Sequence, residues 1–378
     1  MSAQRAAQPT RLVIKVGSSV LTDAQGRLVP GRLDQLVQQL ADCMRGPGNA
    51  EGSARHPLLV SSGAIACGMA KLGLRKRPAA LAQLQACAAI GQSELMHRYI
   101  KALDRHGLTA AQVLLTQDDL ADRTRFRNAK QTLLTLLHKR AVPIVNENDT
   151  VSVEEITFGD NDRLAALVAT AVDAELLVIL SDVDGFLREG RVVERIEGLD
   201  ESHDAAVFGG VRATTKGGMA SKLAAARIVG HNGIPMVIAN GTRPGALSEI
   251  LAGRPVGTLF VPPRSRLTAQ QWWIAFSLRQ PKGAVVIDAG AARALTAQGK
   301  SLLAAGVVEV RGRFDAGAFV VLVDQQGGEL GRGQCNFSAA ELARIRGMSS
   351  AQAAKALGRP RATEVVHRDR LVLAEALR

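Results

Sequence analysis

Aromatic residues are scarce in this sequence, which has two Trp, one Tyr and nine Phe among 378 residues. The last third in particular offers few rings on which nucleic-acid bases could stack. Long apolar runs are missing as well: there is no stretch of about eighteen apolar residues, so a membrane-spanning helix is not expected. The start of the chain is polar and lacks the apolar centre of a secretory signal peptide.

Cysteine is also rare. The four cysteines, Cys43, Cys67, Cys87 and Cys335, lie far apart and form no Cys-x-x-Cys pair. A disulfide framework or a zinc site is therefore not expected. A reducing cytoplasm is the compartment that fits this cysteine usage best.

The net charge of +12 is the unusual feature of the composition. Residues 264–378 hold 17 Lys and Arg against 9 Asp and Glu, while the rest of the chain holds 30 against 26. The basic excess therefore lies mostly in the last third. It has two readings: attraction to a polyanion such as RNA, or an arginine-rich surface that aids solubility. We take the second as the default.

A chain of 378 residues is too long for one average core and predicts two domains. Its first two thirds alternate short runs rich in Val, Ile and Leu with longer stretches of helical spacing. This alternation predicts an α/β fold, a three-layer sandwich with a mostly parallel sheet covered by helices on both faces. The predicted strands are residues 12–16, 58–61, 112–115, 142–146, 176–181 and 235–239. The predicted helices are residues 81–103, 125–139 and 163–171.

The pattern changes at Pro262-Pro263, which closes a first domain predicted to span residues 1–263. Residues 264–280 are predicted to be a linker that holds Trp272 and Trp273. Residues 281–378 then show short β-like runs separated by glycine-rich turns, which predicts a small β-rich domain. Within it, residues 349–361 are predicted to form a surface helix and loop.

Three segments in the first domain combine small residues with a helix start, and two of them also carry lysine. They are Lys15-Val16-Gly17-Ser18, Ser61-Ser62-Gly63, and the run of Lys216, Gly217, Gly218, Met219, Ala220, Ser221 and Lys222. Backbone N–H groups at a helix N-terminus favour phosphate, and lysine adds a positive charge. Each segment taken alone is also compatible with a tight turn chosen for packing.

Two polar clusters lie at the ends of predicted strands, and a third opens a predicted helix. Asn146-Glu147-Asn148-Asp149 follows one strand, Ser181-Asp182 follows another, and Asp160-Asn161-Asp162 opens a helix. Asp and Asn serve as ordinary helix caps, but clusters about a dozen residues apart exceed what capping requires. Since ligands bind beyond the carboxyl ends of parallel strands, these groups predict a site there.

In this order the segments resemble the amino-acid kinase superfamily and, within it, the glutamate 5-kinase branch. The residues that carry the closer resemblance are 144–149 together with 159–162. The last third resembles the PUA domain, a small β-rich barrel, through residues 286–291, 299–303, 327–333 and 366–369. Together the two resemblances cover roughly residues 10 to 372.

The resemblance implies that ATP, carrying Mg²⁺, donates its γ-phosphoryl group to the side-chain carboxylate of L-glutamate. It places Lys15 and Lys222 as catalytic cations on the phosphates and Asp162 as the residue that holds them. An acceptor carboxylate with a pKa near 4.3 is already ionised at neutral pH, so no general base is needed. Magnesium on a nucleotide keeps several waters and needs few protein ligands, so no protein metal ligand is assigned.

The remaining site residues follow from the same resemblance. Ser62, Asp149 and Asn161 match glutamate-binding positions, and Gly17, Ser18 and Gly63 are expected to supply backbone donors. The matching ATP-binding positions are Lys15, Gly17, Ser18, Ser181, Asp182, Lys216, Gly217, Gly218, Met219, Ala220, Ser221 and Lys222. The family pattern further implies a role in proline biosynthesis, a homodimer or homotetramer, and glutamyl phosphate reductase as a partner.

The sequence departs from the family pattern in two places. Thr214-Thr215-Lys216 stands where Gly-Thr is usual in the nucleotide loop, and residues 186–193 are shorter than usual. Two alternatives stay open: a kinase of another amino-acid carboxylate, or an RNA-binding protein whose kinase fold is vestigial. The joint presence of Lys15, Asp162 and Lys222 disfavours the second.

Overall fold

The structure is a computed structural model that describes residues 10–23, 25–46, 55–151, 160–199, 203, 218–263, 271, 274, 281–359 and 364–374. The chain divides into two compact units, Met1–Arg266 and Leu267–Arg378. The precise domain limits inferred from sequence stay a prediction, because most of the predicted linker, Trp272 and Trp273 included, lies outside the described residues.

The first unit contains an eight-stranded sheet in the order β3-β4-β2-β1-β5-β9-β10-β8. Neighbouring strands run parallel except for the antiparallel pair of β9 and β10. The strands are β1 (Thr10–Val16), β2 (Arg55–Ser61), β3 (Ala110–Leu115), β4 (Val142–Glu147), β5 (Leu176–Ser181), β8 (Arg195–Glu197), β9 (Met236–Asn240) and β10 (Thr258–Val261). The predicted mostly parallel α/β sheet is confirmed, with strand ends shifted by up to three residues.

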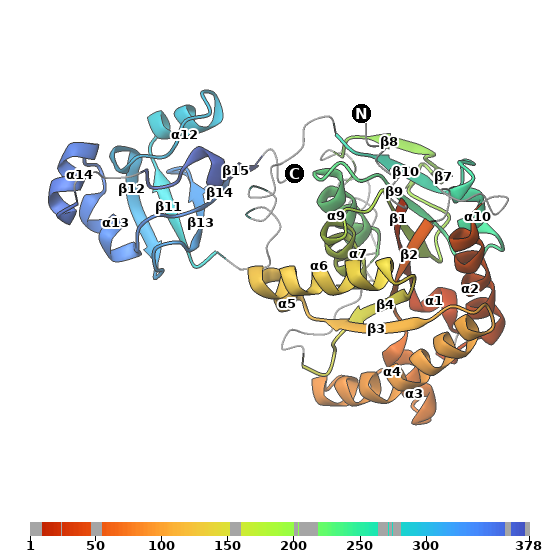
Figure 1. The fold of residues 1–378 in the computed structure, drawn as a ribbon. Helices are drawn as coiled ribbons and strands as arrows, with labels where there is room; N and C mark the ends of the chain where they lie inside the picture. Colours follow the sequence, from red (N-terminus) through yellow and green to blue (C-terminus); the bar gives the residue numbers. More distant parts are fainter. Residues whose placement is uncertain are drawn as a thin grey trace, which may run out of the picture. The chain divides into compact units, whose positions relative to one another are not determined.

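Helices cover both faces of this sheet (Figure 1). They are α1 (Ser18–Leu21), α2 (Pro30–Arg45), α3 (Ala64–Lys71), α4 (Leu81–Asp104), α5 (Gln117–Ala121), α6 (Arg123–His138), α7 (Asp160–Ala171), α9 (Met219–Gly230) and α10 (Ala246–Leu251). Local chemistry sets several helix starts. Proline opens α2, a reciprocal capping box of Thr116 and Asp119 opens α5, and the Asp122 carboxylate caps α6.

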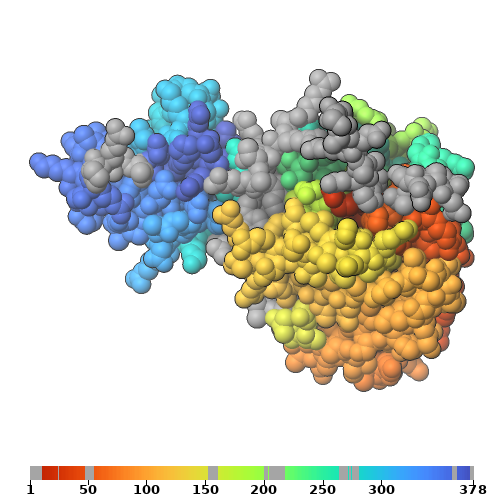
Figure 2. All heavy atoms as spheres, in the orientation of Figure 1, coloured from red at the N-terminus to blue at the C-terminus, as the bar shows by residue number. Residues whose placement is uncertain are grey.

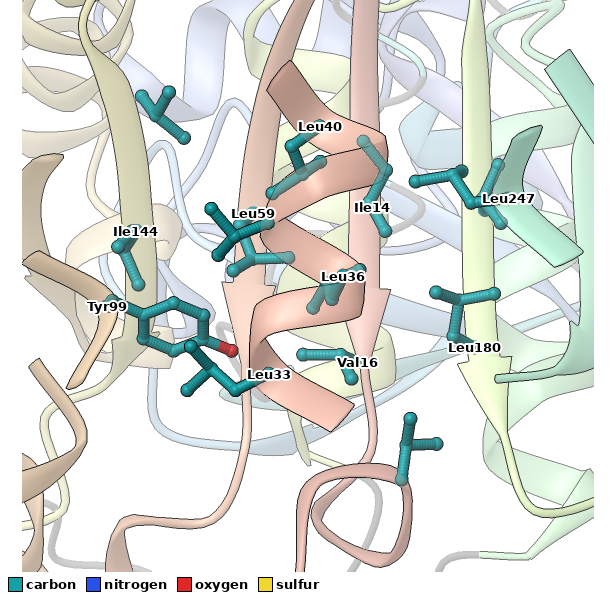
Figure 3. Close-up of a cluster of buried hydrophobic side chains, with 14 of the residues drawn as sticks. Ile14, Val16, Leu33, Leu36, Leu40, Leu59, Tyr99, Ile144, Leu180 and Leu247 are labelled. Atoms are coloured by element: carbon teal, nitrogen blue, oxygen red, sulfur yellow. The ribbon is translucent and has the colours of Figure 1, made fainter. Parts of the chain in front are cut away.

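The central strand β1 sends alternate side chains to opposite faces, as strand geometry requires. Ile14 and Val16 pack with Leu36 and Leu40 of α2 in a dry core, which Figure 3 shows between that helix and the strands. Residues on the opposite face of β1, among them Lys15, therefore point toward the layer that holds α7 and α9. The same alternation that builds the core thus delivers one lysine to the other side of the sheet.

Helices α3 and α4 pack backbone to backbone through two glycines. A Cβ on Gly68 would lie 1.8 Å from the Cys87 carbonyl oxygen, and one on Gly91 would lie 1.8 Å from the Ala64 carbonyl oxygen. No side chain fits at such distances, so glycine is required at both positions for this packing. In the space-filling view, residues of β3 lie between those of α4 and those of α6 on this face of the first unit (Figure 2).

We expect Gly91→Ala to destabilise the protein by about 3 kcal/mol or more, because the added methyl group must push two helices apart. The matched control is Gly31→Ala in α2, where a Cβ would meet nothing within 4 Å. That change should be neutral or stabilising by up to about 1 kcal/mol. Chemical denaturation of the two variants tests this, and equal stabilities would contradict the described packing.

The second unit is built on a five-stranded sheet in the order β12-β11-β13-β14-β15. Its strands are β11 (Gly283–Ile287), β12 (Val307–Gly312), β13 (Phe319–Val323), β14 (Glu329–Gln334) and β15 (Leu371–Leu373). Its helices are α12 (Ala289–Thr296), α13 (Ala339–Ile345) and α14 (Ser350–Leu357), and the last confirms the predicted surface helix. The β-rich character is confirmed, although in the described residues no ladder joins the edge strands β12 and β15 into a closed barrel.

The four cysteines are all buried and free. Burial raises the pKa of the Cys43, Cys67 and Cys335 thiols to about 11. Thiols with such pKa values are almost entirely protonated at neutral pH and are poor nucleophiles. The cysteines therefore act as small core residues.

Candidate active site

Three charged side chains meet at the carboxyl edge of the sheet. The Lys15 Nζ of β1 lies 2.6 Å from one carboxylate oxygen of Asp162 in α7, and the Lys222 Nζ of α9 lies 3.2 Å from the other. The Ser221 hydroxyl donates to the same carboxylate at 2.7 Å. Lys15 and Lys222 are each 6% exposed and Asp162 is fully buried, so one carboxylate holds two ammonium groups away from bulk water.

The electrostatics of this cluster favour an anionic ligand. Burial acts to raise the pKa of the Asp162 carboxyl, but Lys15 and Lys222 outweigh that effect, and the net pKa is lowered. Burial lowers the pKa of Lys15, and the neighbouring Lys222 lowers it further against the opposing attraction of Asp162. With all three groups ionised the cluster has one positive charge in excess, and an anion such as a phosphate would offset it.

A network of partly buried polar side chains lies beside the charged cluster. The Asn161 Nδ2, next to Asp162 in the chain, donates to the Ser62 hydroxyl at 2.9 Å and to the Asn146 Oδ1 at 3.1 Å. The Asn146 Nδ2 in turn donates to the Gln92 Oε1 at 2.8 Å. The network joins the ends of β2 and β4 to α4 and α7, so residues far apart in sequence form one polar surface.

Of the predicted glutamate-binding residues, Ser62 and Asn161 are thus in direct contact. Asp149 lies in the turn after β4, close enough to Arg77 that its charge opposes the burial that lowers the Arg77 pKa. Asp149 therefore brings a carboxylate, with a basic neighbour, to the loop that follows the same strand end as Asn146.

Some of the residues predicted for the nucleotide lie at strand ends near Lys15. Ser181 ends β5, and its hydroxyl donates to the Asp182 carboxylate at 3.1 Å; the Asp182 charge acts on Lys15. Ser18 stands at the start of the one-turn helix α1. Gly63 caps α3 with a φ of 114°, and a Cβ there would meet nothing within 4 Å, so its backbone faces open space.

One expected donor is already in use. The Gly17 N–H donates to the Leu180 carbonyl at 2.9 Å, so this group already has a partner within the protein, and its role as a phosphate donor stays a prediction. The bond ties the turn after β1 to the neighbouring strand β5. A Cβ on Gly17 would lie 3.8 Å from the Lys15 Nζ, so glycine keeps space open beside that ammonium group.

The predicted loop at the start of α9 is described only in part. Gly218 precedes the helix, Met219 and Ala220 form its first turn, and the Gly218 carbonyl accepts from the Ser221 hydroxyl at 3.0 Å. Lys216 and Gly217 lie outside the described residues, as do the Asp160 side chain and Gly159. Their predicted contributions stay untested.

The short segment after Gly185 folds as a tight hairpin. Strands β6 (Leu187–Arg188) and β7 (Arg191–Val192) pair through Glu189 and Gly190, both with positive φ. Such a two-residue turn fits the twist of the paired strands, so the hairpin needs few residues.

Two residues of the site were missed in the sequence. Gln92 completes the amide network, and the Tyr99 hydroxyl is 3.0 Å from the Ser61 hydroxyl in a fully buried contact. Both lie on α4 seven residues apart, a spacing that places them on one helix face. That spacing was the only available signal, and it does not distinguish site residues from ordinary core residues.

Comparisons with known proteins match both halves of the chain. The model of the amino acid kinase family matches residues 10–240, and that of the PUA domain matches residues 283–357. Glutamate 5-kinase of Salinispora arenicola is 48% identical over 96% of this chain and 97% of its own length. The chain belongs to the glutamate 5-kinase family.

Other members of the family are similar over the same extent. Glutamate 5-kinase of Thermus thermophilus is 46% identical and that of Moorella thermoacetica is 43% identical, each over 97% of both chains. Among solved structures, UMP kinase from Ureaplasma parvum superposes with a TM-score of 0.44 at 14% identity, covering 67% of this chain and all of that one.

Within the described residues, no group of three or more His, Cys, Asp and Glu side chains is arranged to hold a metal ion. Among the helices in that same part of the chain, none combines the length and the apolar character that crossing a membrane requires.

Proposed function

We propose that this member of the glutamate 5-kinase family transfers the γ-phosphoryl group of ATP to the side-chain carboxylate of L-glutamate. The product is L-glutamyl 5-phosphate, and the reaction is the first step of proline biosynthesis. The observation that carries the proposal is the buried cluster of Lys15, Asp162 and Lys222, with its excess positive charge, beside a polar network suited to an amino acid.

The chemical step joins two anions. A glutamate carboxylate oxygen forms a bond to the γ-phosphorus while the bond to the oxygen that bridges the β- and γ-phosphates breaks, and ADP leaves with that electron pair. No proton has to be removed from the acceptor at neutral pH. The rate enhancement then comes from positioning and from cations placed where negative charge develops.

In this proposal Lys15 and Lys222 are the catalytic residues that neutralise the transferring oxygens. Asp162 is a positioning residue: each of its two carboxylate oxygens contacts one of the ammonium groups, and the Ser221 hydroxyl donates to it. Because these partners are buried and held by one another, few water molecules have to reorganise as charge moves.

The two substrates would bind to different parts of the site, glutamate at the polar network and ATP at the strand and helix ends near Lys15. Ser62, Asn161 and Asp149 would bind the glutamate backbone groups, with Asp149 and the Asn161 carbonyl facing the ammonium group. On the nucleotide side, the helix starts at Ser18 and Gly218 would contribute backbone donors, together with Ser181, Asp182 and the loop at Lys216. Mg²⁺ would arrive as part of the ATP substrate.

Further aspects of the proposal rest on family resemblance. They are a homodimer or homotetramer, cooperation with glutamyl phosphate reductase, and a cytoplasmic location, which the four free buried cysteines suit. The PUA-like unit would bind RNA if its basic excess serves a polyanion rather than solubility.

The pH dependence of ATP binding follows from the lowered Lys15 pKa. A phosphate beside Lys15 favours the protonated form and raises the pKa toward or above the ordinary value of about 10.4. We therefore expect MgATP binding to take up protons, and to weaken as pH rises, in the window between the lowered pKa of the free protein and the higher pKa of the complex. Calorimetry in buffers of different ionisation enthalpy measures the uptake, which should vanish in Lys15→Met; uptake that persists in the variant would contradict the assignment.

The direct test of the substrate is an acceptor series. Purified protein with MgATP would be assayed for ADP release with L-glutamate, L-aspartate, N-acetylglutamate or no acceptor. Release that depends on L-glutamate supports the proposal. Release with another acceptor alone would move the enzyme to a neighbouring branch of the superfamily.

A further inference from the structure

The polar network beside the lysine cluster contains two buried atoms that have no hydrogen-bond partner in the described part of the chain. They are the Gln92 Nε2 and the Asn161 Oδ1. A buried polar atom left without a partner costs about 1–3 kcal/mol, so such atoms call for an explanation. The neighbouring hydrogen bonds fix which way each amide faces.

A backbone N–H group fixes the orientation of the Asn146 side-chain amide. The Glu147 N–H donates to the Asn146 Oδ1 at 2.9 Å, and a backbone donor cannot be inverted, so this bond settles which side of the Asn146 amide holds the oxygen. The Asn146 Nδ2 must then face Gln92, where the Oε1 accepts at 2.8 Å. The Gln92 Nε2 is therefore the atom that faces away from Asn146 and has hydrogens to donate.

The Asn161 amide is fixed in the same way. Its Nδ2 faces the Asn146 Oδ1 at 3.1 Å, the Ser62 hydroxyl at 2.9 Å and the Ser61 carbonyl at 3.4 Å. The Asn161 Oδ1 is left as an acceptor. The network thus presents one donor and one acceptor, which is the pairing that an α-carboxylate and an α-ammonium group require.

The positions of Asn161 and Gln92 along the hydrogen-bonded network indicate which end of the substrate the Asn161 Oδ1 and the Gln92 Nε2 would contact. Asn161 adjoins Asp162, which holds both lysines, while Gln92 is two hydrogen bonds further along the network. The reacting carboxylate must lie at the lysines. The α-carboxylate of the same molecule then falls toward Gln92.

We propose that Gln92 is a specificity-determining residue whose Nε2 donates to the α-carboxylate of the substrate while its Oε1 holds Asn146. This inference rests on the proposed function and adds a substrate contact to it. Gln92 directly follows Gly91, whose close contact with α3 brings this part of α4 toward the strand ends. The α3–α4 glycine packing therefore serves the site as well as the fold.

The test compares L-glutamate with 4-aminobutyrate, which has the same amine and reacting carboxylate but no α-carboxylate. Gln92→Met, a change of similar volume, should raise KM for glutamate about 10- to 100-fold, the range for a hydrogen bond to a charged group. KM for ATP should stay within about twofold, and kcat/KM or the inhibition constant for 4-aminobutyrate should not change. The preference for glutamate should fall by the factor lost in glutamate binding.

A second variant separates direct contact from mere support of Asn146. Gln92→Glu keeps an oxygen acceptor for Asn146 but sets a negative charge against the α-carboxylate, so its glutamate KM should rise at least as much as in Gln92→Met. Gln83→Met, on an exposed position of the same helix, is the control and should behave as wild type. Turnover of glutamate by the wild-type protein, measured first, tests the proposed function independently of the variants.

Two results would overturn the inference while leaving the proposed function intact. If both variants keep the wild-type preference for glutamate over 4-aminobutyrate, the α-carboxylate is bound elsewhere. If Gln92→Glu binds glutamate normally while Gln92→Met does not, Gln92 only orients Asn146.

Discussion

Replacing Lys222 by methionine should lower kcat by about 10³-fold or more, because one of two cations that face the developing charge is removed from a dry site. Methionine matches the length of the lysine stem, so the apolar packing of α9 is kept. Removing a single preorganised donor from other active sites costs about 10²–10³ in kcat, and a full charge should count for at least as much. The measurement is steady-state ADP release at saturating MgATP and L-glutamate.

The matched control is Lys130→Met. Lys130 pairs with Asp173 at 3.0 Å on the surface of the first unit, and neither side chain is buried. A surface ion pair contributes about 0–1 kcal/mol, so this variant should keep kcat and stability close to wild type. Turnover of Lys222→Met within tenfold of this control would remove Lys222 from the catalytic assignment.

Opposite stability effects are expected within the same three-residue cluster. In the wild-type protein each carboxylate oxygen of Asp162 contacts one lysine ammonium group. In Asp162→Asn an amide NH₂ replaces one of these oxygens, so one buried ammonium group faces a donor where it had an acceptor. Breaking a buried ion pair from one side costs about 3–5 kcal/mol. For a unit of this size we expect Tm to fall by roughly 10 °C.

Lys15→Met should instead leave Tm unchanged or raise it. Burial lowers the pKa of Lys15, which means that its charged form is less favourable in the folded protein than in water. The unfolded chain binds this proton more tightly, so wild-type stability rises with pH through the window between the lowered and ordinary pKa values. That rise should be smaller in Lys15→Met.

Scanning calorimetry of both variants and of the double variant checks this account. The double variant should recover part of the stability lost in Asp162→Asn, since only one buried ammonium remains. A larger Tm loss in Lys15→Met than in Asp162→Asn would contradict the view that the second lysine is held for function at a cost in stability.

The sequence was most informative where local chemistry decides structure. Apolar runs marked the central strands, because a parallel strand buried on both faces needs Val, Ile and Leu at nearly every position. Lys15 interrupts such a run, and since β1 is central, that lysine had to be buried with a counter-ion. The resemblance to the amino-acid kinases, and not the strand pattern, placed Asp162 and Lys222 beside it.

Other features depend on tertiary contacts and left no local signal. Gln92 and Tyr99 lie in a long helix with ordinary spacing, and that helix packs closely on α3 through Gly68 and Gly91. The Gly17 N–H faces a strand that is distant in sequence, so its bond to Leu180 could not be foreseen. The pairing order of the second unit was likewise not available from its short β-like runs.

The most direct test of phosphoryl transfer to the side-chain carboxylate follows its oxygen. L-glutamate labelled with ¹⁸O in its side-chain carboxylate would be incubated with protein, MgATP and hydroxylamine, which attacks an acyl phosphate at carbon and releases phosphate. The account predicts one ¹⁸O in each phosphate released together with a hydroxamate. Unlabelled phosphate would show that water, rather than the carboxylate, accepts the phosphoryl group, and would contradict the account.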